Sequence, residues 1–397
     1  MWTVVLLSGA LLHAGPTVEV QPLSGKPISG TLSALTAEKI ALETPQGPVT
    51  LEIGKIMGVT VKRPPGGSRP QPAVWLEMVD GSAPAGTQFT VNEGRARLTL
   101  AEGATLEIPI RDVRWVRFGP QTEAMARQWS RILEKERKTD FLVVKKGDAL
   151  DENQGVLRNV AEDTVQFELD GELLPVKRER VYGLVYHQVA GRQLPQPLCT
   201  IREAAGAAWA ARSLATNRDQ LEWTTPTGLK LARPLAALAR IDFSHGKIVY
   251  LSDLKAESVE WVPYYAIAGG SAARAALFAP RQDRSLASGP LVVEGVQYAK
   301  GLGLHSRTTL VYRLPESFRR FSAVAGIDDR VRPRGHVLLA VRGDGRVLWN
   351  GPVTGTEPAK AIDVDVAGVR RLTIFVDFGD DLDVADHLDL CEARLIK

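Results

Sequence analysis

"GTLSALTAEKIALETPQGPVTLEIGKIMGVTV", residues 30–61, aligns without a gap with "GVLRNVAEDTVQFELDGELLPVKRERVYGLVY", residues 155–186. Gly30 aligns with Gly155 and Gly58 with Gly183, and apolar residues recur at the same places between them. Apolar and polar residues alternate in short runs that are separated by turn residues, a pattern typical of half-buried antiparallel strands in hairpins. Each stretch therefore predicts a small unit built of short β-strands.

Looser copies of the same pattern occur twice more, so repetition is the main feature of the first half of the chain. The sequence predicts repeat 1 at 17–61, repeat 2 at 73–118, repeat 3 at 141–188 and repeat 4 at 197–245. Five short strands in a unit of this size resemble a small SH3-like or Sm-like barrel. Such barrels bind peptides or RNA in other proteins, but no basic stripe with interleaved aromatic residues occurs here. We therefore interpret the repeats as spacers, anchors or protein-contact modules.

A helix is expected at 121–139, between the second and third repeats. It would place apolar residues on one face and charged residues on the other, with Thr122 as the N-cap. The face could pack on a neighbouring barrel or bind a partner helix, and the sequence leaves both open. A second helix is expected over 202–217, in place of the first strands of repeat 4. The apolar face of the first helix consists of Ala124, Trp129, Ile132 and Leu133.

Composition narrows the class of protein. Of 397 residues, 44% are hydrophobic, which is enough for sizeable cores, and Lys+Arg 49 against Asp+Glu 46 leave a net charge of +3. This small, interspersed charge gives no support for nucleic-acid or membrane-surface binding. The two cysteines, Cys199 and Cys391, stand far apart in different predicted domains. Their spacing matches neither a disulfide framework nor a zinc knuckle, so we expect two buried free thiols.

The N-terminus, residues 1–14, has an apolar run followed by small residues. This pattern predicts a signal peptide that is cleaved near Ala14, and a buried first strand is the alternative interpretation. No other run approaches the ~18 consecutive apolar residues of a membrane span. We expect an exported protein that is periplasmic, attached to the cell envelope or extracellular.

From about residue 247 the strands become longer, as in "GHVLLAVRGDGRVLWNGPV" (335–353), with Asp344 and Gly345 as a hairpin turn. Runs of this kind predict one jelly-roll β-sandwich at 247–397. The expected fold class is thus mainly β, with repeated small barrel-like units followed by a sandwich.

Several motifs in order resemble the NPCBM family of carbohydrate-binding modules. They include "DRSLASGPLVVEGVQYAKGLGLHSRTTLVYRL" (283–314), "VRGDGRVLWNGPV" (341–353) and "DHLDL" (386–390). The resemblance covers 247–397 and implies a galactose-binding-like β-sandwich, carried by exported bacterial proteins and often found beside glycoside hydrolases. It also implies that some relatives bind galactose-containing glycans and hold a structural calcium ion.

The family motif Lys-Gly-x-Gly-x-His is matched by Lys300, Gly301, Gly303 and His305. Two glycines directly before a strand permit positive φ or a close approach of another backbone. A histidine that opens such a strand can satisfy backbone carbonyls or contact a sugar, and the sequence does not decide between these roles.

The paired acids of the family are matched by Asp328 and Asp329. Adjacent side chains on a strand point to opposite faces, so these two cannot act as a glycosidase pair with carboxyls ~5–9 Å apart across one bond. We expect one of them to fasten the following loop. Trp349 could stack on a sugar face or pack in the core. The family favours a tryptophan where this chain has Leu390, which weakens the case for a sugar platform there. The candidate carbohydrate-binding residues are Lys300, His305, Asp328, Asp329, Trp349 and His387.

The acidic loop "DFGDDLDVADHLD" (377–389) supplies oxygen atoms that suit a hard cation, but it lacks the spacing of an EF-hand. A solvated acidic loop is the alternative. Because the resemblance implies a structural calcium ion, the donors available for it are Asp253, Asp380, Asp381, Asp383, Asp386 and Glu392.

No catalytic residues are predicted, because the chain has no G-x-S-x-G elbow, no P-loop and no dinucleotide-binding glycine motif. The leading hypothesis is an exported, non-catalytic protein whose sandwich binds carbohydrate and whose β repeats space or anchor it. The alternative is a cell-envelope scaffold whose sandwich binds protein and not sugar.

Overall fold

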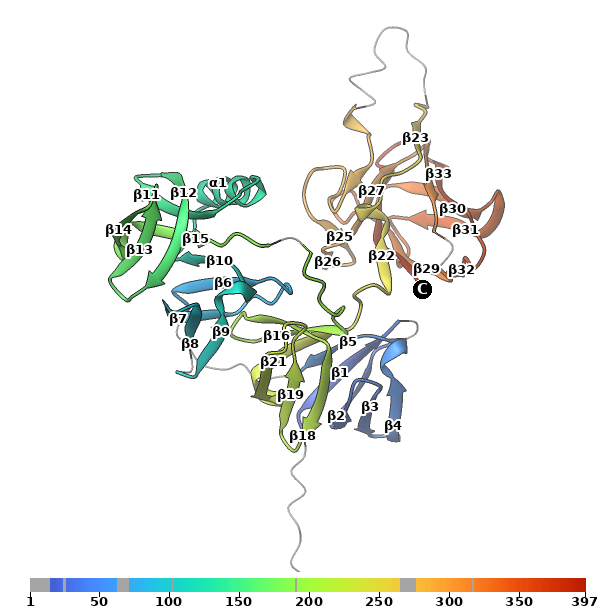
Figure 1. The fold of residues 1–397 in the computed structure, drawn as a ribbon. Coiled ribbons are helices and arrows are strands. Elements are labelled where there is room, and N and C mark those ends of the chain that lie inside the picture. Colours follow the sequence, from blue (N-terminus) through green and yellow to red (C-terminus); the bar gives the residue numbers. More distant parts are fainter. Residues whose placement is uncertain are drawn as a thin grey trace, which may run out of the picture. The chain divides into compact units, whose positions relative to one another are not determined.

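The computed structural model describes residues 15–23, 26–62, 71–101, 103–189, 191–264, 276–315 and 318–397. The chain divides into two compact units that meet at His245 and Gly246. Figure 1 shows that both are built of antiparallel strands. The predicted signal peptide, residues 1–14, lies outside the described residues.

Repeats 1 to 3 of the first unit each have five strands and repeat 4 has six, and in all four one turn of 3-10 helix precedes the last strand. Repeats 1 and 2 comprise β1 (Thr17–Pro22), β2 (Ile28–Leu35), β3 (Lys39–Thr44), β4 (Gly47–Glu52), η1 (Ile53–Lys55) and β5 (Ile56–Val61), and then β6 (Val74–Met78), β7 (Ala85–Asn92), β8 (Arg95–Leu100), β9 (Thr105–Pro109), η2 (Ile110–Asp112) and β10 (Val113–Phe118). Repeats 3 and 4 comprise β11 (Asp140–Lys146), β12 (Ala149–Val160), β13 (Thr164–Leu169), β14 (Glu172–Lys177), η3 (Arg178–Arg180) and β15 (Val181–Val185), and then β16 (Cys199–Glu203), β17 (Ala208–Ala211), β18 (Ser213–Asn217), β19 (Gln220–Thr224), β20 (Lys230–Pro234), η4 (Leu235–Ala237) and β21 (Leu238–Asp242).

The prediction of a helix over 202–217 is wrong, because this segment forms β16, β17 and β18. Its alanine-rich composition suggested a helix, but the large apolar side chains follow a period of two. Ile201, Trp209 and Leu214 are buried, and exposed residues such as Arg202 and Ser213 lie between them. Burial of this alternating set in the barrel outweighs the intrinsic helix preference of alanine.

The last strands join the repeats in pairs, 1 with 4 and 2 with 3. Val59 of β5 lies opposite Ile241 of β21, and Val116 of β10 lies opposite Leu184 of β15. Repeats 2 and 3 thereby share a ten-stranded sheet, and repeats 1 and 4 share an eight-stranded one, with β18, β19 and β20 in a sheet of three. Each repeat therefore shares a sheet with another repeat, although the two aligned segments, 30–61 and 155–186, lie in different sheets.

In every repeat, the strand before the 3-10 turn lies at the end of its sheet and contains a proline. Because proline has no N–H to donate to a neighbouring strand, it blocks further pairing at an edge. Each repeat thus leaves its last strand, and not the strand before the turn, for pairing with another repeat. The four prolines are Pro48, Pro109, Pro175 and Pro234.

The helix between repeats 2 and 3, α1 (Glu123–Glu134), covers the outer face of their paired strands. Thr122 caps it by accepting a hydrogen bond from the Met125 amide at 3.3 Å, as expected. Met125, Trp129 and Ile132 are buried, whereas Ala124 is exposed. Trp129 and Ile132 thus lie on the apolar face as expected, and Met125 takes the place that was expected for Ala124. The helix packs on a neighbouring barrel, which answers the question that the sequence left open.

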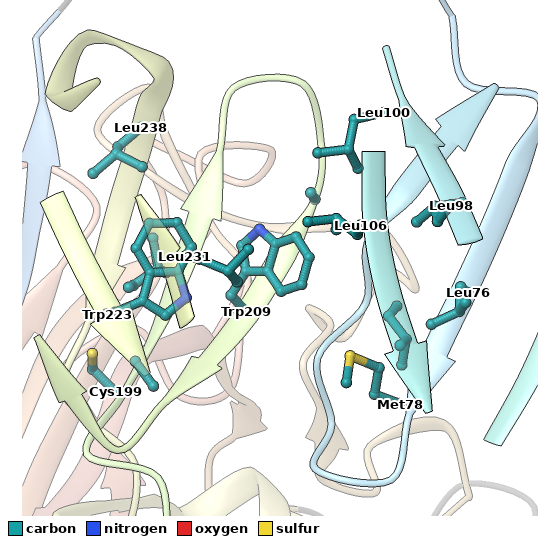
Figure 2. Packing of buried hydrophobic residues seen from close by; sticks show 14 of the residues in the cluster. Leu76, Met78, Leu98, Leu100, Leu106, Cys199, Trp209, Trp223, Leu231 and Leu238 are labelled. Atoms are coloured by element: carbon teal, nitrogen blue, oxygen red, sulfur yellow. The ribbon is translucent and has the colours of Figure 1, made fainter. Parts of the chain in front are cut away.

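Repeats 2 and 4 also touch each other. Residues 79–84 of repeat 2 reach repeat 4, where Ala83 bridges to Ala208 and the Asp80 carboxylate accepts a hydrogen bond from the Thr227 hydroxyl at 2.9 Å. Buried side chains of both repeats belong to one cluster, and Figure 2 shows Trp209 and Trp223 of repeat 4 with Leu106 of repeat 2 in the same view. Four barrels therefore form a single unit and not a flexible string.

The second unit is a sandwich of two main sheets, as expected for its class. One sheet has the order β24-β27-β34-β29-β32, with β22 also paired to β34, and the other has the order β23-β28-β33-β30-β31. Its elements are β22 (Ile248–Tyr250), η5 (Leu251–Asp253), β23 (Ser258–Trp261), β24 (Arg281–Gln282), β25 (Leu291–Val293), β26 (Val296–Tyr298), β27 (Gly301–His305), β28 (Thr308–Arg313), β29 (Arg320–Ile327), β30 (His336–Gly343), β31 (Arg346–Thr354), β32 (Lys360–Asp365), β33 (Arg371–Phe378) and β34 (His387–Ile396).

Two smaller expectations can be checked directly. Asp344 and Gly345 form the hairpin turn between β30 and β31 with positive φ at both residues, as the Asp-Gly pair predicts. Cys199 and Cys391 are both buried, and neither forms a disulfide, as expected.

Within the described part of the chain, no helix has the length and apolar character needed to cross a membrane.

Candidate functional site

The motif that contains His305 lies on β27, whose side chains alternate between the two faces of its sheet. Leu302 and Leu304 point into the sandwich core, which places Gly301, Gly303 and His305 on the outer face. The neighbouring strand β34 repeats this arrangement. Leu388 and Leu390 belong to the core, and His387, Asp389 and Cys391 therefore share the outer face with His305.

Residues 283–298, which we name the cover segment, lie over this outer face. A Cβ atom on Gly303 would lie 2.5 Å from the Arg284 carbonyl oxygen, and one on Gly326 would lie 2.3 Å from Cγ1 of Val293. A Cβ atom on Gly301 would approach both the Leu390 carbonyl and Cδ1 of Leu291. The glycines of the motif are therefore structural, because any side chain would lift the cover segment from the sheet.

At the margin of the cover segment, His305, His387 and Asp328 form a row across three adjacent strands. His305 is paired with His387 in the β27–β34 register, and their ring centroids are 6.0 Å apart. The Asp328 amide donates to the His387 carbonyl oxygen at 2.9 Å. Three of the six candidate sugar residues thus come together at one place on the sandwich.

Two aromatic residues that the sequence analysis did not select extend this row. The Phe278 ring lies 4.1 Å from the His305 ring, centroid to centroid, and the Trp261 ring stacks on Phe278 at 5.2 Å. The Trp261 indole N–H donates to the Ser306 carbonyl oxygen at 2.9 Å, and His305 Nδ1 contacts the same oxygen. Trp261 and Phe278 both remain partly exposed. The sequence "EWVPYY" (260–265) has three aromatic residues in six positions, which could have indicated Trp261.

Both histidines of the row are neutral at pH 7. Burial lowers the pKa of His305 and the pKa of His387, since an imidazolium would lose hydration there. His305 is only 2% exposed. The buried Nδ1 of His387 has no hydrogen-bond partner among the residues that the structure describes. This nitrogen is itself buried, whereas the His387 ring as a whole is partly exposed.

The paired acids fasten two different loops. Asp328 is fully buried and accepts hydrogen bonds from the backbone N–H and Nε of Arg330, at 3.0 and 3.1 Å. Asp329 accepts from the amides of Glu294 and Gly295 at 2.9 and 2.6 Å, which fixes the turn between β25 and β26. Both carboxylates hold loops, which extends the expectation that one would.

Two further carboxyl groups lie near the row. Burial, and then the neighbouring Asp328, raises the pKa of Asp389 to about 8, so this group is largely protonated at pH 7. Asp386 is also fully buried and accepts from the His336 amide at 3.1 Å. Burial raises the pKa of Asp386 to about 6, with smaller contributions from Asp381 and Asp383.

Lys300 does not lie in the row. Its Nζ is bonded to Asp253 Oδ1 at 2.5 Å and to Asp283 Oδ2 at 2.7 Å, and it lies 5.6 Å from the Tyr250 ring. These contacts fasten the beginning of the cover segment to η5 and leave Lys300 with a structural role.

Trp349 also lies elsewhere, on β31 at the edge of the other sheet. It stands opposite Val341 and packs, partly buried, against the sandwich core. Leu390, where the family favours tryptophan, is fully buried in that core. Its side chain is not on the surface of the row, so the absence of a tryptophan at this position says nothing against a sugar platform there.

The six acidic residues considered for calcium occupy two places. Asp253 and Glu392 lie beside Lys300 and Tyr250, where Glu392 accepts from the Tyr250 hydroxyl at 3.2 Å. The other four belong to the loop before β34, in which the Asp380 side chain is 97% exposed. Among the described residues, no three acidic, His or Cys side chains converge as a metal site. Calcium binding stays a prediction.

Comparison with known proteins supports the sandwich assignment. The family model described as the NPCBM/NEW2 domain matches residues 248–396. A curated protein of Renibacterium salmoninarum, provisionally named an endo-alpha-N-acetylgalactosaminidase, is 36% identical over 88 residues. That match covers 22% of this chain and only 6% of the relative.

Two solved structures from Clostridium perfringens are also similar. One is the CBM51 of GH95 in complex with methyl-galactose, with 25% identity, a TM-score of 0.32, and coverage of 37% of this chain and 99% of that one. The other, CBM51-2 with the INT domains of ZmpB in complex with GlcNAc, has 22% identity and a TM-score of 0.33, and the match covers 53% of this chain and 40% of that one. Residues 248–396, less than half of this chain, therefore match the model of the NPCBM/NEW2 domain.

Proposed function

We propose that the protein is an exported, non-catalytic carbohydrate-binding protein whose sandwich takes a glycan at the row formed by Trp261, Phe278, His305 and His387. The observation that carries this proposal is the chemistry of the row. A sugar presents apolar C–H faces and a ring of hydroxyls, so its site needs aromatic surface beside fixed polar groups. Trp261 and Phe278 supply the first, and the partly exposed, neutral imidazole of His387 supplies the second.

The family match supports a glycan as the ligand, and a galactose-type sugar is the one to test first. The module named in the solved complex above was obtained with methyl-galactose. For the first unit, we propose the role of a stiff anchor. Pairing of repeats 1 with 4 and 2 with 3, and the contact between repeats 2 and 4, support a rigid platform better than a flexible spacer.

Titration of the full chain with methyl-galactoside, N-acetylglucosamine and other hexoses, followed by NMR and calorimetry, tests the proposal. One small aromatic platform should give a Kd on the order of 0.1–1 mM, or about −4 to −5.5 kcal/mol. Shifts confined to residues of the row would support it. If no sugar perturbs the folded protein at tens of millimolar, the sandwich is a protein-binding scaffold and not a glycan-binding module. Detection of a new N-terminus near Gly15 in the native cells would test export.

A further inference from the structure

We propose that Arg330 is a positioning residue of the glycan site, which holds the cover segment and the charge of Asp328 in place beside His387 without touching the ligand. This inference rests on the proposed function. It concerns a residue at the end of β29, behind the row.

Arg330 connects the end of β29 with the cover segment. Its backbone N–H and Nε both bond to Asp328 Oδ1, and its Nη2 lies 3.0 Å from Asp328 Oδ2. The same Nη2 donates to the Pro290 carbonyl oxygen at 2.7 Å and to the hydroxyl of the fully buried Ser285. A planar guanidinium with several donors can make all these bonds at once, which an ammonium group cannot reproduce.

The turn at 285–289 is shaped around this guanidinium. A Cβ atom on Gly289 would lie 2.2 Å from Arg330 Nη1, so only glycine fits at that place without a shift. The Ser285 amide donates to the Gly289 carbonyl oxygen at 3.0 Å, which closes the turn. The same turn packs on Gly303, two residues before His305. Loss of the guanidinium would therefore loosen the part of the cover segment that lies next to the row.

Arg330 also balances a buried negative charge beside His387. Asp328 is fully buried, and its carboxylate contacts the Arg330 guanidinium through both oxygens. Loss of one partner from a buried ion pair leaves the other charge uncompensated, which is strongly destabilising. Without the cation, the loop at the end of β29 would therefore shift beside His387.

The test compares Arg330→Met, Arg330→Lys and the control Arg334→Met, all in the full chain. Arg334 is an exposed arginine in the same loop. Three quantities are measured: the ring NMR chemical shifts of His305 and His387 at one fixed pH, amide protection of residues 285–290, and the Kd for methyl-galactoside. His387→Gln assigns the histidine signals.

For Arg330→Met we expect the ring shifts of His305 and His387 to change, since the cover segment beside them is no longer held in place. We also expect lower protection at 285–290 and a Kd increase of about tenfold, since loss of fixed geometry weakens binding. Arg330→Lys should also lose protection and affinity, because lysine retains the charge and not the fork. Arg334→Met should change none of the three.

Each outcome decides between the proposals. If the wild type binds sugar and Arg330→Met binds equally well with unchanged protection, the positioning role is wrong and the proposed function stands. If the wild type binds no sugar, the proposed function fails and this role fails with it, whatever the histidine does. Should Arg330→Met unfold, Arg330→Lys carries the test, because affinity equal to the wild type in that folded variant would also overturn the inference.

Discussion

The indole of Trp129 occupies the space that a side chain on Gly183 would need. A Cβ atom at Gly183 would lie 2.5 Å from Cη2 of Trp129 and 2.9 Å from the Val116 carbonyl oxygen, where β10 and β15 pair. A Cβ atom on the aligned glycine of repeat 1, Gly58, would lie 2.8 Å from Nη2 of Arg240. Both pairs of repeats therefore pack a side chain over a glycine of a last strand, a tryptophan of α1 in one pair and an arginine of β21 in the other.

This relationship predicts that Gly183→Ala destabilises the first unit. The methyl group would have to displace a buried ring or a strand backbone, and overpacking of this kind costs about 1–3 kcal/mol. Urea unfolding followed by tryptophan fluorescence measures the change in the free energy of unfolding. Gly54→Ala is the matched control, because a Cβ atom there meets nothing within 4 Å. Equal stability of the two variants would contradict the packing described here.

A second prediction concerns the pairing of repeats that are distant in sequence. Thr60 of β5 and Arg240 of β21 are direct partners, so Thr60→Cys with Arg240→Cys should form a disulfide on mild oxidation. Thr60→Cys with Arg114→Cys tests the alternative, in which consecutive repeats 1 and 2 pair, and should not crosslink. Native Cys199 and Cys391 are buried and should not interfere. A crosslink in the second variant alone would reverse the assignment of partners.

The sequence predicts the strands of the barrels and the sandwich, but not which repeats join. Alternating residues such as Leu32, Ile40 and Leu42 identify strands because burial on one face requires a period of two. The choice of partner depends on last strands that look alike, since β5 and β10 are both six-residue strands with a buried valine, Val59 or Val116, at the fourth position. Nothing local distinguishes them, and the order 1 with 4 and 2 with 3 emerges only in three dimensions.

The same limit applies to the site. His305 and His387 could be selected because a family motif marks them, and the β27–β34 register brings them together. Trp349 was selected for its residue type, yet it lies on β31, at the opposite edge of its sheet from β23, which carries Trp261. Trp261 and Phe278 lie far before His305 in the sequence, and only the closure of the sandwich places their rings in one row.

A third prediction separates the two tryptophans. Trp261→Ala should abolish detectable glycan binding, since aromatic stacking supplies a large part of the free energy of a weak sugar site. Trp349→Ala should leave the Kd within about twofold and lower stability, because partial core packing of a large side chain is lost. Calorimetric titration and thermal unfolding of both variants decide. If binding were lost with Trp349→Ala and retained with Trp261→Ala, the glycan site would lie at Trp349 on β31 and not at the row.

A fourth prediction follows from Asp389. Its pKa in the folded state is about 8, above the ordinary value of an aspartic acid, so the folded protein binds a proton that the unfolded chain has lost. The free energy of unfolding of the sandwich should therefore fall as the pH rises from about 4 to 8. Asp389→Asn should flatten this dependence and stabilise the sandwich at pH 8, measured by urea unfolding at several pH values. Asp380→Asn, at an exposed site, should leave the slope unchanged. A slope of the opposite sign in the wild type would show that Asp389 is ionised when folded.

The last prediction is that the sandwich binds calcium at the loop before β34. Asp381, Asp383 and Asp386 lie close enough that the first two raise the pKa of the third, and such mutual repulsion is relieved when a cation binds. The buried Asp386 is the carboxylate most in need of a counter-charge. At a calcium concentration of about 100 Kd, the free energy of unfolding should increase by about 2.7 kcal/mol. Thermal unfolding of the full chain in millimolar calcium and in chelator measures this, and Asp386→Asn should remove most of the difference, whereas Asp363→Asn, on β32, should not. Identical unfolding curves for the wild type in calcium and in chelator would show that this loop is a solvated acidic turn and holds no ion.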